Sequence, residues 1–227
     1  GGWMGEHYGW RPVFYLLGCV GLAYGLVLVR LLRGRPQAAP EQRPGFWRTA
    51  GGLFATKGFP VVLTVFALTS LASWLTYTWL PLFLYERFQM SLASAGFAST
   101  FYVQVMAVAG ILGGGWVSDL WSRRQPRARV WVQAVGLAVA GPFLTLSAGA
   151  ATPLALYCAL VAFGLGRGMY DCNVMPVLCR IVRDDQRATA YGLMNFAGVM
   201  VGGASAYAGG LVKSTVGLAG AMQAGGV

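Results

Sequence analysis

Two opposite charges lie four residues apart in the apolar stretch AFGLGRGMYDCNVMP, residues 162–176: Arg167 and Asp171. On a helix this spacing places them on one face, where they can form an ion pair. The planar fork of a guanidinium also suits bidentate capture of a carboxylate or a phosphate. Asp171 can pair with Arg167 when the site is empty, or take up a proton. Burying either charge is costly, so the surroundings of this stretch decide what the pair does.

Those surroundings are strongly apolar. Charged residues make up 11% of the 227-residue chain and hydrophobic residues 56%, whereas a soluble domain has about 25% charged residues. A bilayer is spanned by about 20 apolar helical residues. Segments of suitable length are 12–32, 58–85, 93–118, 130–150, 153–179 and 188–212, followed by a shorter apolar segment at 216–227. The sequence therefore predicts an all-α, polytopic membrane helical bundle.

The positive charge gathers in three connecting segments. Residues 33–57, 119–129 and 180–187 hold +8 of the net charge of +10, and they alternate with loops that carry almost none. By the positive-inside rule these segments face the cytoplasm, which places the N-terminus of the chain on the other side. No basic cluster is interleaved with aromatic residues, so nucleic acid is not an expected partner. The expected surroundings are the lipid bilayer, of the plasma or inner membrane.

Residues that commonly carry catalysis or metals are sparse. The only histidine is His7, and none of the four cysteines (Cys19, Cys158, Cys172, Cys179) forms a C-x-x-C pair. Without a nucleophile–base pair or a ligand cluster in the spans, we expect no enzyme, metal or cofactor. No segment resembles a channel filter either.

Polar residues are shared unevenly among the spans. Those in segments 58–85, 93–118, 153–179 and 188–212 predict that these four surround a hydrated site, whereas 12–32 and 130–150 face lipid or plain packing. An ionisable residue inside a span usually faces such a site. The candidate residues for substrate binding or ion coupling are Thr76, Gln104, Arg167, Tyr170, Asp171, Asn173 and Asn195.

A second motif, GGGWVSDLWSRRQPRAR, occupies residues 113–129. Gly115 would allow close helix contact, and Asp119 would end the helix at the membrane surface. Arg123 and Arg124 would then bridge to Asp119 or to a neighbouring helix end. Such a conformational latch can hold one state of a moving bundle. The alternative is a simple basic stop after a membrane helix.

This motif resembles the G-x-x-x-D-x-x-x-[RK]-[RK] loop of the major facilitator superfamily, although Leu120 and Ser122 replace a usual basic residue and a usual glycine. GWRPVF at 9–14 and RDDQRATAYGLMN at 183–195 are similar to other segments of that family. The resemblance implies that residues 1–32 contain the last helix of an N-terminal half and 33–57 the central cytoplasmic linker. Residues 58–227 would form the C-terminal half with its last helix incomplete. About six and a half transmembrane helices of a longer protein would be present, and the N-terminal six-helix half would be missing.

The resemblance also implies a function. Segment 153–179 would line the central cavity, and the protein would be a secondary active transporter working by alternating access. We expect its substrate to be a small organic solute, an anion captured by Arg167, moved with a coupling proton or sodium ion. Three alternatives remain open: a multidrug or metabolite exporter, an inactive fragment, and a purely structural role for the Arg167–Asp171 pair.

Overall fold

The structure is a computed structural model that describes residues 8–9, 11–32 and 45–224, with side chains described for 8–9, 11–31 and 45–211. Its regular elements in this part of the chain are helices only. In order they are α2 (Arg11–Leu32), α3 (Phe46–Ala55), α4 (Phe59–Phe88), α5 (Leu92–Ser122), α6 (Ala128–Ala148), α7 (Pro153–Ile181), the 3-10 turn η1 (Asp184–Gln186) and α8 (Arg187–Ala224).

Five of these helices are long and apolar enough to cross a membrane: α2, α4, α5, α6 and α7. The predicted all-α membrane bundle is confirmed, and the predicted spans agree with the helices to within a few residues at most ends. One boundary differs: α8 continues through residues 213–215, where the sequence predicted a break before the segment 216–227. Polar residues at these positions do not end a helix, because Lys is a good helix former and Ser and Thr are tolerated within one. Residues 1–7, 10, 33–44 and 225–227 lie outside the described part, and residues 33–44 are the first part of the predicted linker.

Glycines allow the central helix α7 to contact both of its main neighbours at backbone distance. A Cβ on Gly164 would lie 2.5 Å from the carbonyl oxygen of Val103 in α5, and one on Gly166 would lie 2.5 Å from that of Gly136 in α6. A Cβ on Gly168 would overlap the carbonyl of Ala107 in α5. In lipid such close packing replaces the hydrophobic effect as the source of helix association. The other extensive pairing joins α4 and α8.

Two clusters of buried apolar residues lie at opposite ends of the bundle. One contains Leu80, Phe83, Leu144 and Leu156. The other, which we call the basic-end core, contains Leu53, Phe59, Tyr170, Val174, Leu178, Val182, Ala190 and Met194. Helices α4, α6 and α7 contribute to both clusters or their margins, so the middle of these helices lies between the two cores.

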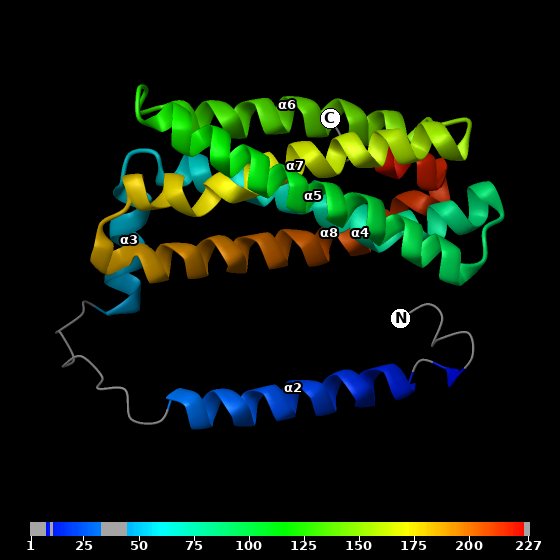
Figure 1. The fold of residues 1–227 in the computed structure, drawn as a ribbon, viewed down its shortest axis with the longest axis horizontal. Helices are drawn as coiled ribbons and strands as arrows, with labels where there is room; N and C mark the ends of the chain where they lie inside the picture. The colour runs from blue at the N-terminus through cyan, green and yellow to red at the C-terminus, as the bar shows by residue number, and fades with distance from the viewer. Residues whose placement is uncertain (1–7, 10, 33–44, 225–227) are drawn as a thin grey trace.

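The spans run side by side, and the connections α5–α6 and α7–α8 lie at the same end of the bundle as α3 (Figure 1). The described basic residues of these connections and of α3 therefore share one end, as the predicted topology requires. Helix α2 lies apart from the other spans in that view, and its apolar side chains are exposed, including Phe14, Leu22 and Leu31.

Candidate functional site

A cavity of about 600 Å³ lies at mid-span between the two cores. Its walls come from α4, α6, α7 and α8. Most lining side chains are apolar or aromatic, and Arg167 and Asp171 are the charged ones among the described residues. The lining includes Phe66, Thr69, Ser73, Trp74, Tyr77, Leu137, Ala140, Leu144, Phe163, Arg167, Tyr170, Asp171, Asn195, Gly198 and Val199.

Arg167 is held from two sides. Its Nε lies 3.4 Å from Asp171 Oδ2, one helical turn further along α7. Its guanidinium carbon lies 4.9 Å from the centre of the Tyr77 ring on α4, a cation–π geometry that orients the guanidinium plane. The arginine side chain is 25% exposed and the aspartate 36%. The pair is thus partly open to the cavity, and an anionic group that enters meets a guanidinium already positioned.

Tyr77 is itself connected to a third helix. Its hydroxyl donates to Gln104 Oε1 of α5 across 3.4 Å. Gln104 therefore contacts Tyr77 without lining the cavity. The sequence did not single out Tyr77 as a site residue, although it occurs among the polar residues of the same span. Its role follows from tertiary contact with Arg167, which spacing along one helix does not reveal.

The cavity contains four of the seven predicted residues: Arg167, Tyr170, Asp171 and Asn195. The other three lie elsewhere. Thr76 is buried and donates to the Ala72 carbonyl oxygen at 2.7 Å. Gln104 accepts from the Tyr77 hydroxyl, and Asn173 is fully buried at the α5–α7 interface. These three are therefore not among the lining residues of this cavity, and a role for them in substrate binding or ion coupling stays a prediction.

The choice of helices also needs correction. We expected 93–118 to line the site and 130–150 to face plain packing, yet α6 lines the cavity and no described residue of α5 does. The contribution of α6 is apolar, made by Leu137, Ala140, Gly141 and Leu144. Polarity therefore failed to identify this wall. Helix α5 instead packs its polar Ser118 against α7.

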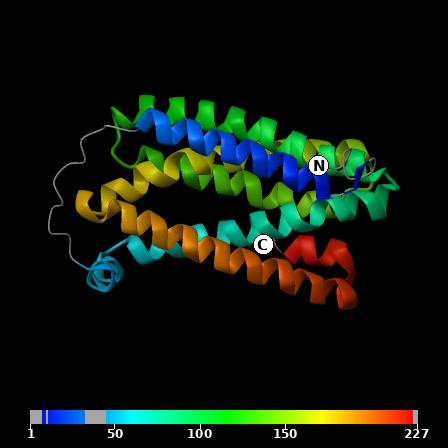
Figure 2. The ribbon, with the colours of Figure 1, turned by 90° about the horizontal axis from the view of Figure 1, so that it is seen from below.

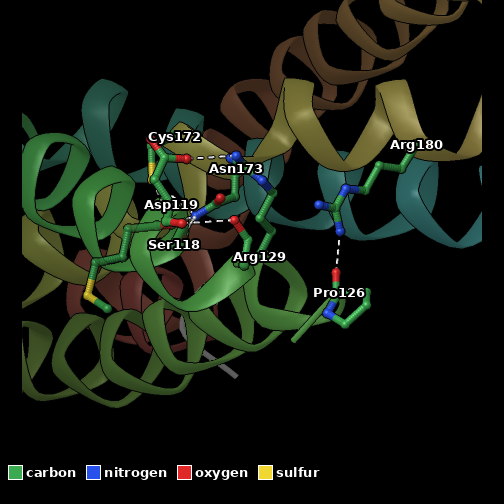
Figure 3. Close-up of polar contacts among 9 residues, drawn as sticks. Ser118, Asp119, Pro126, Arg129, Cys172, Asn173 and Arg180 are labelled. Carbon is green, nitrogen blue, oxygen red and sulfur yellow. Dashed lines mark hydrogen bonds and ion pairs between the residues drawn. The ribbon is translucent and has the colours of Figure 1, made fainter. Parts of the chain in front are cut away.

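Asn173 and Ser118 form a polar contact within an apolar interface (Figure 3). Asn173 Nδ2 donates to Ser118 Oγ at 2.8 Å and lies 3.3 Å from the Met169 carbonyl oxygen. Its Oδ1 has no hydrogen-bond partner among the described residues. The contact fixes the register of α7 against α5 toward the basic end, next to the glycine contacts.

The predicted latch has a different ion pair from the one expected. Asp119 accepts from Arg129 Nη2 of α6 at 2.7 Å, rather than from Arg123 or Arg124 (Figure 3). It does not end the helix, because α5 continues to Ser122. At that point the chain turns, which carries Arg123 and Arg124 beyond the last helical turn and brings α6 back alongside Asp119.

The glycine that makes the close helix contact is also one position earlier than expected. A Cβ on Gly115 would meet nothing within 4 Å, whereas one on Gly114 would lie 2.9 Å from the Met169 Cα. One residue corresponds to about 100° around a helix, so Gly115 points away from α7. The close contact predicted for Gly115 is made by Gly114.

A second link joins the two connections at this end. Arg180, in the last turn of α7, donates through Nη1 to the Pro126 carbonyl oxygen of the α5–α6 connection (Figure 3). Arg187 pairs with Asp184 at 2.7 Å and donates to the Cys179 carbonyl oxygen at 3.0 Å. Across the α7–α8 connection, Arg187 therefore satisfies a carbonyl group in the last turn of α7.

Comparison with known proteins agrees with this architecture. The chain is 27% identical over 221 residues to an "MFS-type efflux pump" of Mycolicibacterium smegmatis, covering 95% of this chain and 51% of that protein. The chain thus spans about half the length of the curated relative it matches. In fold it is similar to a bacterial homologue of the human lysosomal transporter Spinster, solved in an inward-facing, unoccupied conformation. The TM-score is 0.65 and the identity 20%, over 99% of this chain and 57% of that one.

Family assignment rests on a match that covers most of the chain. The family model described as Major Facilitator Superfamily matches residues 1–207. Together with the membrane-spanning helices, this match shows that the chain belongs to the Major Facilitator Superfamily, whose members are transporters.

Proposed function

We propose that this chain forms part of a secondary active transporter that moves a small amphipathic organic anion by alternating access. The observation that carries the proposal is the Arg167–Asp171 pair in a mid-span cavity, with Arg167 held over the Tyr77 ring. The volume of about 600 Å³ is in the usual range for small-molecule sites. Aromatic and aliphatic walls favour an apolar body, and the guanidinium favours one carboxylate or phosphate on it.

The pair also offers a route to ion coupling. An anionic substrate competes with Asp171 for the guanidinium, because each satisfies the same charge. Protonation of Asp171 would release Arg167 for the substrate, and deprotonation would restore the internal pair. We therefore propose a proton as the coupling ion, with sodium as the alternative for the same carboxylate. The proposed location is the plasma or inner membrane, with the basic segments in the cytoplasm and the N-terminus of the chain outside.

A second candidate function is export of multiple drugs or metabolites. It is favoured by the predominance of apolar and aromatic side chains in the cavity, among them Phe66, Trp74 and Phe163, and by the name of the mycobacterial relative, an efflux pump. In this case the walls supply the binding energy, and Arg167 with Asp171 serves as a structural ion pair. The two candidates differ in whether transport depends on the substrate's charge.

The test is transport by the full-length protein of aromatic carboxylates and of their uncharged amides, in vesicles of both orientations. If Arg167 captures the anion, R167K loses most carboxylate transport, because an ammonium cannot reproduce the fork. If R167K and the parent protein instead transport the acids and the amides at equal rates, the apolar walls recognise the substrate, as the second candidate function requires. The vesicle orientation that supports accumulation gives the direction.

A double-variant comparison separates binding from structure. If the pair is structural, R167A and D171A each impair transport and the double variant recovers it, since a pair removed whole leaves no unpaired charge. If Arg167 binds substrate, all three remain impaired at normal surface expression. The matched control is the exposed pair Arg183–Asp185, at 3.3 Å, whose double alanine variant should transport normally.

A further inference from the structure

The short helix α3 has three faces with different chemistry. Thr49, Ala50 and Leu53 are buried against the bundle. Trp47 and Phe54, seven residues apart and hence on one face, are 85% and 54% exposed. A helix this short with two large aromatic side chains in the open has an apolar face that the described residues leave uncovered.

The third face is polar or small. Arg48 and Gly52 are four residues apart and share a side about 100° or more away from the aromatic face. Both are exposed. The arrangement of an aromatic face, a buried face and an arginine-bearing face is that of a helix lying at a boundary between apolar material and water.

The orientation of α3 agrees with such a boundary. The helix crosses the direction of the spans in Figure 1 and is seen nearly end-on, at the edge of the bundle, in Figure 2. It packs on the beginnings of α4 and α8, and its Leu53 belongs to the basic-end core. A helix perpendicular to the spans, at the level where they begin, lies in the plane of the membrane surface.

We propose that α3 is an interfacial anchor whose aromatic face inserts into the lipid headgroup region at the basic end of the bundle. Trp47 and Phe54 are the inserted side chains, with Phe46, 52% exposed and 5.2 Å from the Trp47 ring between centroids, at the edge of the face. Indole and phenyl rings favour this level of a bilayer. Arg48 lies on the aqueous side, where the charge complements the phosphates of the lipid surface.

The partner is a lipid surface rather than a protein because of the place and charge of the patch. The aromatic face is continuous with the ends of membrane-spanning helices, and basic residues Arg48 and Lys57 flank it. The proposal does not depend on the substrate or on the proposed role of Arg167. Its consequence is that the first turns of α4 and α8 are tied to the membrane surface through α3.

The test measures which solvent surrounds each face of α3 in the full-length protein. A transport-competent variant with its cysteines replaced receives one cysteine, W47C, F54C or the matched control G52C, each labelled with an environment-sensitive NBD dye. The proteins are reconstituted in phosphatidylcholine–phosphatidylglycerol vesicles that contain doxyl-labelled lipid, or are exposed to aqueous iodide on both sides. All three positions are exposed, so the labels do not enter the core.

We expect doxyl lipid to quench the dyes at 47 and 54 at least about twofold more than the dye at 52, and iodide to give the reverse order. Equal access of iodide to positions 47 and 52 would overturn the proposal, because the aromatic face would then lie in water. Shielding of position 47 from both quenchers would also overturn it, because a protein, either a second copy or another part of this one, would then cover the face.

Discussion

The contact between α5 and α7 gives a sharp prediction about two adjacent glycines. In G114A the added methyl group would lie 2.9 Å from the Met169 Cα, 3.1 Å from its Cγ and 3.3 Å from Cys172 Sγ. Carbon atoms in contact are normally about 3.5–4.0 Å apart. The methyl group is therefore too close by about 0.6–1 Å to a backbone atom, which cannot rotate away. In G115A the same group would meet nothing within 4 Å.

The difference between these two variants isolates the packing cost. Both gain the same helix propensity on changing Gly to Ala, up to about 1 kcal/mol. Overpacking costs about 1–3 kcal/mol, and it applies to G114A only. We therefore expect G114A to be less stable than G115A by about 1–3 kcal/mol and to melt at a lower temperature, by a few degrees.

The assay is thermal unfolding of the purified full-length variants in detergent, followed by tryptophan fluorescence. G113A, whose methyl group would also meet nothing within 4 Å, is a second control. The reasoning is refuted if G115A is the destabilised variant or if both variants melt together. The first result would mean that α5 is rotated from its position here, so that the motif glycine makes the close contact. The second would mean that Gly114 carries no packing cost.

Three further predictions concern the basic end and the cavity wall. D119N and R129Q should each slow transport several-fold with little change in melting temperature, since an exposed pair contributes at most about 1 kcal/mol. The charge swap D119R/R129D should restore transport, and failure of the swap would refute the pairing. A cysteine at Gln125 should resist an impermeant thiol reagent in intact cells, and labelling from outside would reverse the topology. G202A, whose methyl group would overlap the Trp74 ring at the cavity, should alter the transport KM, whereas G203A, facing open space, should not. Equal KM values for the two variants would mean that Trp74 takes no part in substrate binding.

The sequence predicted the features that depend on local pattern. Hydropathy over about 20 residues located the spans, and the four-residue spacing of Arg167 and Asp171 predicted their ion pair. Both rest on geometry within one helix. The family resemblance, carried by the motif at 113–129, then supplied the order of the helices.

Features that depend on helix rotation were not predictable in the same way. Neighbouring residues of a helix are separated by a turn of about 100°. The orientation of the helices therefore makes Gly114, rather than Gly115, the glycine in contact with α7, and it places Asn173 at the α5 interface instead of in the cavity. The partner of Asp119 was likewise open, because several arginines follow it and only the path of the connection selects Arg129. Helix α6 joined the cavity through apolar side chains, which a search for polar residues passes over.

The uneven packing among the helices has a mechanical consequence. Helix α7 touches both α5 and α6 backbone to backbone, and α4 is paired mainly with α8, while α7 makes few contacts with α4 or α8. Close-packed interfaces deform little, whereas loosely joined elements can slide. The cavity has walls from both groups, so a wedge-shaped solute pressing on it would displace the α4–α8 pair against a stiff three-helix block. If the proposed substrate binds in this cavity, solutes of different girth would be accommodated by movement of α4 and α8, while Arg167 stays on the stiff side.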